Sequence, residues 1–149
     1  MTGKRAGAAL RGQAVFGVSD GLMSILGVVL FIAARSPALV FPAALMGGVS
    51  AAYSMGAGEF LGEDDSPGWA ASLVMGAATF AGTVLPAVPY LWCAGWAALA
   101  QSCAVCLLVA LLVGHLRSWR PHRYAETTLV IALGVILTFA CSLLTGGAP

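Results

Sequence analysis

The stretch Gly17–Leu30 reads GVSDGLMSILGVVL and lies inside a run apolar enough to cross a membrane. One residue interrupts this run, because Asp20 places a carboxylate within it. On membrane-insertion scales, an aspartate at the centre of a spanning helix costs about 2.5–3.5 kcal/mol. Charged residues inside spanning helices usually face a bundle interior or a water-filled path and serve a function. Asp20 is therefore a candidate functional residue of a membrane helix.

The composition of the whole chain is that of an integral membrane protein in a lipid bilayer. Of its 149 residues, 60% are hydrophobic and 9% are charged, whereas soluble domains carry about 25% charged residues. The apolar blocks are long and do not alternate as strands do, which favours an all-α membrane protein. The net charge of +1 gives no reason to expect a nucleic-acid partner. The length fits a single transmembrane domain over residues 1–149.

Five apolar blocks are each long enough to span a bilayer, for which about 20 residues suffice. Five transmembrane helices are predicted, at about Gln13–Ala34, Ala38–Leu61, Trp69–Tyr90, Ala94–Leu116 and Glu126–Leu144. The breaks between them are short, so consecutive helices are expected to run antiparallel. The first block is too long for the apolar part of a signal peptide, and we expect it to be retained.

The basic residues predict the orientation in the membrane. Six of the seven Lys and Arg residues precede the first span or lie between the fourth and fifth, and only Arg35 follows the first span. Cytoplasmic loops carry the excess of basic residues. With five spans, the N-terminus is predicted to be cytoplasmic and the C-terminus to lie outside.

The depth of the polar residues suggests a candidate site. Asp20 lies about 10 Å from the cytoplasmic start of its span, while Met55 and Glu59 lie about 9 Å and 3 Å from the cytoplasmic end of theirs. Met55 and Glu59 share a helix face because they are four residues apart. Carboxylates suit divalent cations, and a thioether shifts the preference toward transition metals. Taken alone, Met55 is more typical of core packing.

Several other residues are weaker candidates. Met23, one turn after Asp20, and the acidic segment Glu63, Asp64 and Asp65 are possible secondary ligands, although a solvated turn explains the acidic segment equally well. His115 and His122 flank a basic loop and are read as solvated. Cys93, Cys103, Cys106 and Cys141 form no recognisable metal or redox pattern. The sequence shows no catalytic set, so we expect neither an enzyme nor a tightly bound cofactor.

Small residues recur at four-residue spacing and indicate where helices approach closely. They include Gly17 and Gly21 on either side of Asp20, a ridge from Ala44 to Gly56 and another from Ala94 to Gly114. Packing within one subunit explains such ridges as well as dimerisation does.

Three segments together resemble the vacuolar iron transporter (VIT) family, which includes nodulin-like proteins. They are the Asp20-Gly21 pair, the motif SMGAGEFLG from Ser54 to Gly62, and the pattern GTVLPAVPY from Gly82 to Tyr90. The resemblance implies a five-helix homodimer that moves Fe²⁺ or Mn²⁺ out of the cytosol in exchange for protons. It also implies that Asp20 and Met55 line the path, and it places the motif glutamate at Glu59.

The chain departs from the family in two ways. Gly62 stands where the family motif ends in serine, and GEDDSPG from Gly62 to Gly68 replaces the glutamate-rich cytosolic domain that many members insert there. The alternative to transport is therefore a non-transporting membrane subunit or scaffold with the same fold. The Ala-, Gly- and Arg-rich composition suggests a bacterial plasma membrane, with a vacuolar-type membrane expected if the source is eukaryotic.

Overall fold

Helices make up the architecture of the chain. The computed structural model describes residues 3–33, 35–62, 68–117, 126, 129–130, 132–134, 136–137, 140–141 and 144. Its elements are α1 (Gly3–Ala33), the 3₁₀ helix η1 (Pro37–Leu39), α2 (Val40–Gly62), α3 (Trp69–Val84), the 3₁₀ helix η2 (Leu85–Leu91) and α4 (Gly95–Arg117). The described residues between 126 and 144 are also helical, and no strand occurs among the described residues.

Four helical stretches are long and apolar enough to cross a membrane: Gly7–Ala33, Pro37–Gly62, Trp69–Leu91 and Gly95–Arg117. They confirm the first four predicted spans, because a helix satisfies its own backbone hydrogen bonds in lipid. The predicted fifth span, Glu126–Leu144, lies only partly within the described residues. The first helix starts at Gly3, ten residues before the predicted apolar start, since its early Lys, Arg and Ala residues also favour helix.

Prolines divide two of the predicted spans into shorter elements. Pro37 occupies the first turn of η1, where its missing N–H costs no hydrogen bond. The span beginning at Trp69 is α-helical only to Val84, and the segment that holds Pro86 and Pro89 continues as η2. Proline removes a backbone donor inside a helix, which accounts for the change to 3₁₀ geometry.

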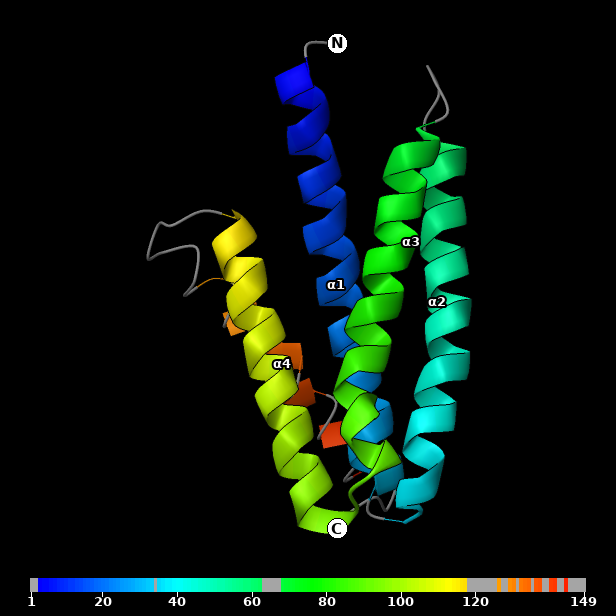
Figure 1. The fold of residues 1–149 in the computed structure, drawn as a ribbon, viewed down its shortest axis with the longest axis vertical. Coiled ribbons are helices and arrows are strands. Elements are labelled where there is room, and N and C mark those ends of the chain that lie inside the picture. Colours follow the sequence, from blue (N-terminus) through cyan, green and yellow to red (C-terminus); the bar gives the residue numbers. More distant parts are fainter. Residues whose placement is uncertain are drawn as a thin grey trace.

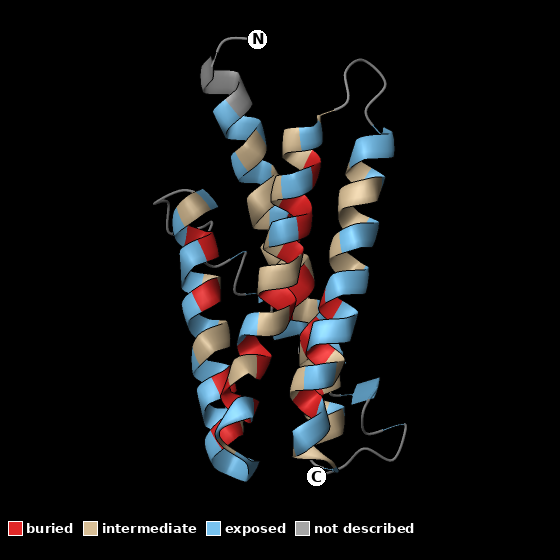
Figure 2. Ribbon diagram, turned by 45° about the vertical axis from the view of Figure 1, so that its right-hand side comes forward, coloured by how far each residue is buried: buried red, intermediate tan, exposed pale blue. Residues whose placement is uncertain are grey.

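The four long helices run alternately up and down, and α3 lies between α1 and α2 (Figure 1). Helix α3 packs extensively against both of these neighbours, whereas α1 and α2 touch each other over a smaller area. Helix α4 packs against α1 and η2. Figure 2 shows buried residues along the inward faces and exposed residues outside, as expected when outer faces meet lipid.

Glycines on α1 and α3 allow the closest approach in the bundle. A Cβ atom at Gly17 would lie 2.5 Å from the carbonyl oxygen of Met75, and one at Gly21 would collide with that of Thr79. From the other side, a Cβ at Gly82 would collide with the carbonyl oxygen of Val18. The absence of side chains therefore lets the two backbones pack together.

Hydrophobic clusters complete the core on either side of this contact. One joins α1, α2, η2 and α4 and contains the fully buried Ile25, Val40, Ala44, Ala87 and Ala98, among others. The second joins α1 and α4 through Leu22, Val109 and Val113. These clusters show that the small residues Ala44 and Ala98, each 0% exposed, pack within the subunit.

Candidate functional site

Helices α1 and α2 are joined by a polar contact near the start of α1 and the end of α2. The side-chain amide Nε2 of Gln13 donates a hydrogen bond to Oε1 of Glu59. Both side chains are half-buried. The contact fixes how the two antiparallel helices align along their axes.

Asp20 lies on the same face of α1 as Gln13. Seven residues are close to two full turns, so Asp20 is displaced about 10 Å along the helix with little rotation. Other faces of α1 contact other helices. Gly17 and Gly21 contact α3, and Leu22 packs toward α4. Asp20 is half-buried, and around the helix it lies between Gln13, which contacts α2, and Met23, which contacts Gly134 of the fifth helical segment.

Met55 lies one turn before Glu59 on α2, about 6 Å along the axis, and is also half-buried. Since Glu59 is level with Gln13, Met55 and Asp20 differ in depth by about 4–5 Å, which is less than one helical turn. Counted by helix rise from the Gln13–Glu59 contact, Met55 and then Asp20 therefore lie progressively deeper than Glu59.

The structure identifies the helix that approaches the glycines beside Asp20. The spacing of Gly17 and Gly21 indicated a close approach without naming the partner. In the structure α3 makes this approach, with Thr79 and Thr83 against the glycines. The hydroxyl groups of both threonines donate to carbonyl oxygens one turn earlier in α3, which satisfies them inside the bundle. The glycines therefore fix the position of α3 against α1.

The secondary candidates are placed less favourably. A Cβ at Gly134 would lie 3.3 Å from the Met23 sulfur, so Met23 packs against the fifth helical segment. Glu63, Asp64 and Asp65 lie outside the described residues, as does His122. His115 is exposed in the last turn of α4, as expected of a solvated residue.

The four cysteines, Cys93, Cys103, Cys106 and Cys141, form no disulfide bond. Cys93 accepts a hydrogen bond from the exposed side chain of Gln101 at 3.3 Å. Cys103 and Cys141 are exposed, whereas Cys93 and Cys106 are half-buried.

The described residues contain no group of three or more His, Cys, Asp or Glu side chains that could hold a metal ion. Asp20 and Glu59 are instead separated along the helix axes, with the Met55 thioether at an intermediate position. Separated ligands suit successive weak contacts with a passing cation better than one tight resident site. Gln13 was missed by sequence reasoning, and its only signal was its position two turns before Asp20.

The part of the chain that holds these candidate residues matches a known protein family. Residues 12–67 match the model of the VIT family. The match covers the first two predicted spans, agrees with the resemblance and includes Gln13, Asp20, Met55 and Glu59. The VIT family is a transporter family. No curated protein and no solved structure matches the chain.

Proposed function

We propose that this chain exports Fe²⁺ or Mn²⁺ from the cytosol in exchange for protons. The observation that most supports the proposal is the hydrogen bond from Gln13 to Glu59, because it brings together the two helices that carry Asp20, Met55 and Glu59. All three residues fall within the segment that matches the VIT family.

The chemistry of the three side chains supports a divalent transition metal as the substrate. Carboxylate oxygens bind hard and borderline cations, and the Met55 sulfur favours transition metals over Mg²⁺ or Ca²⁺. A carboxylate binds a metal ion only when it is deprotonated, so protons and metal ions compete for Asp20 and Glu59. Release of metal on one side and protonation on that side would couple the two fluxes.

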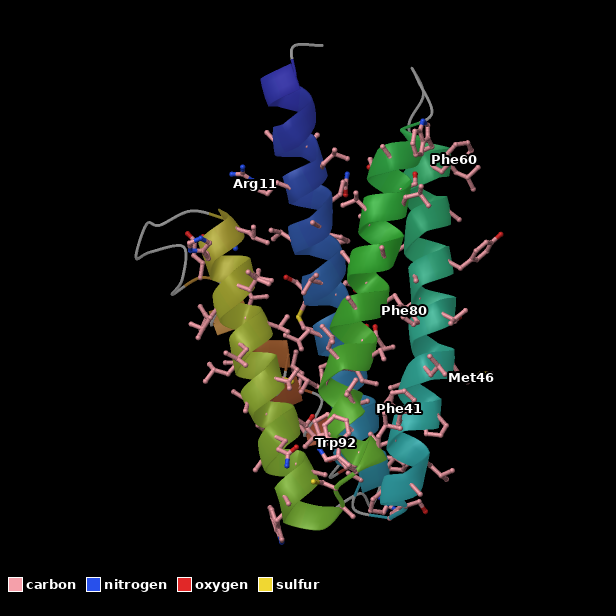
Figure 3. The ribbon with its side chains drawn as sticks, viewed as in Figure 1. Arg11, Phe41, Met46, Phe60, Phe80 and Trp92 are labelled. Carbon is pink, nitrogen blue, oxygen red and sulfur yellow. The ribbon has the colours of Figure 1, made fainter. Side chains whose placement is uncertain are left out.

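The distribution of basic residues supports a cytoplasmic position for the Glu59 end of the proposed path. Lys4 and Arg5 lie in the first turn of α1, and Arg117 lies in the last turn of α4 at the same end of the bundle (Figure 1). Arg11 projects from α1 away from α2 and α3 near this end (Figure 3). Arg35 lies at the opposite end, where it donates to the carbonyl oxygen of Phe31. By the positive-inside rule, cytosolic metal would first meet Glu59.

The proposal includes a homodimer in a bacterial plasma membrane. The resemblance to the VIT family implies two copies, and α2 carries a free face for contact between them. Gly47, Ser50, Ser54 and Gly58 are exposed on one stripe of α2. A second copy packed against this stripe would lie beside Met55 and would cover the open side of the path.

A metal-tolerance assay tests the proposed export. Cells that lack their own exporter are grown in increasing Fe²⁺ or Mn²⁺ with the wild type, Asp20→Ala or Ser19→Ala. Ser19 is the matched control, because it lies at the depth of Asp20 but on a different face of α1. The wild type and Ser19→Ala should raise tolerance, and Asp20→Ala should not. Equal tolerance in all strains and in the empty-vector control would favour a non-transporting subunit or scaffold.

A further inference from the structure

We propose that Gln13 is a positioning residue that holds the Glu59 carboxylate in place for the arriving cation. The inference rests on the proposed function, since it concerns the entry residue of the same path. It starts from the one described hydrogen bond between side chains of α1 and α2, in which Gln13 Nε2 donates to Glu59 Oε1.

The chemistry of this pair leaves Glu59 able to bind a cation. An ionised carboxylate has two oxygen atoms and only accepts hydrogen bonds, whereas a glutamine amide carries two N–H donors and one carbonyl oxygen. The bond from Gln13 engages Oε1 of Glu59 and leaves Oε2 for another partner. The neutral amide also adds no positive charge that would repel an incoming metal ion.

The location of the pair explains why positioning matters. A glutamate side chain loses rotamer entropy when it is fixed, and this loss opposes metal binding. The hydrogen bond from Gln13 orders the Glu59 side chain before the metal arrives, so less entropy is lost when the metal binds. Because Gln13 and Asp20 share a face of α1, the bond also keeps Glu59 on the side of α2 nearest Asp20. Gln13 therefore prepares Glu59 to pass a cation inward.

This role predicts a change in KM more than in the maximal rate. Without the amide, Glu59 must be ordered by the metal itself, so apparent affinity falls while the later steps at Met55 and Asp20 remain. Hydrogen bonds to charged groups are worth enough to change an equilibrium by about tenfold or more. We expect Gln13→Leu to raise the KM for Mn²⁺ about tenfold with the maximal rate changed less than threefold.

The experiment measures initial Mn²⁺ flux against Mn²⁺ concentration in proteoliposomes made with the full chain. Gln101→Leu is the matched control, because Gln101 is exposed on α4 and its amide contacts Trp92 and Cys93. Thermal melting in detergent checks that each variant is folded. Gln13→Asn keeps the amide on a shorter side chain, and it carries the same prediction of a raised KM if the leucine variant does not insert.

A double variant separates positioning from general effects on the fold. In a Glu59→Gln background, which should itself raise the KM, adding Gln13→Leu should change the KM less than twofold, because the carboxylate to be positioned is gone. A KM for folded Gln13→Leu or Gln13→Asn within twofold of the wild type would overturn the inference. A raised KM for Glu59→Gln in the same experiment would still support the proposed function, even if the Gln13 variants behave like the wild type. Absence of Mn²⁺ flux in the wild type would overturn both.

Discussion

At the scale of single residues, the position of Asp20 explains how an apolar helix accommodates a carboxylate. Asp20 is half-buried on α1, two turns from Gln13 and beside glycines that pack against α3. A charge in this position avoids direct burial in lipid, which is where the insertion cost is highest. The same position brings it within one turn of the depth of Met55.

The sulfur of Met55 should favour the transport of transition-metal ions. Met55→Leu keeps an apolar side chain of similar size but removes the thioether, so transport of Fe²⁺ should fall several-fold while the fold is kept. Met46→Leu is the matched control on the same helix, since Met46 is 75% exposed and points away from the bundle (Figure 3). Initial Fe²⁺ flux in proteoliposomes measures the difference. Identical flux for the two variants would remove Met55 from the path.

At the scale of elements, the contact between α1 and α3 is the part of the fold most sensitive to small changes. Gly21→Ala places a methyl group against the backbone of α3 at Thr79, so the helices must move apart. Overpacking of this kind costs about 1–3 kcal/mol. A methyl group at Gly12, on the same helix, meets nothing within 4 Å and should gain helix propensity.

Thermal melting in detergent compares these two alanine variants with the wild type. Gly21→Ala should melt several degrees lower, and Gly12→Ala should melt at or above the wild-type temperature. A stable Gly21→Ala protein would mean that α1 and α3 are not held at the separation described.

Helix spans could be predicted from the sequence, but helix neighbours could not. Long apolar runs determine where helices cross a membrane, so the bounds near Ala33, Trp69 and Arg117 follow closely from composition. The residues Gly17 and Gly21 indicated a close approach, yet four-residue spacing does not say which helix approaches. Gln13 was overlooked because a single amide near the start of a span has no periodic pattern, and its partner lies 46 residues away.

At the scale of the whole molecule, the proposed homodimer depends on the exposed stripe of α2 formed by Gly47, Ser50, Ser54 and Gly58. The small residues Ala44, Gly48 and Gly56 are already used within the subunit, where they contact or pack near other helices. The stripe is the part of α2 left for a second copy. Its exposed small side chains would allow two α2 helices to approach closely.

Cross-linking in lipid tests this arrangement. In a chain whose four native cysteines are replaced, Ser54→Cys should form disulfide-linked dimers, whereas Leu73→Cys, exposed on α3, should not. Monomers at Ser54→Cys across a range of protein-to-lipid ratios would contradict dimerisation through this stripe.

The central claim is that the Asp20 carboxylate carries the metal ion across the membrane, and flux through Asp20→Asn tests it most directly. Asparagine keeps the size and hydrogen bonding of aspartate but removes its charge, so the variant should insert and fold normally. Initial Fe²⁺ and Mn²⁺ flux is measured in proteoliposomes with equal amounts of wild-type and Asp20→Asn protein. The account predicts metal flux for the wild type and flux near the protein-free background for Asp20→Asn. Wild-type rates of Fe²⁺ and Mn²⁺ transport by a correctly inserted Asp20→Asn protein would contradict it.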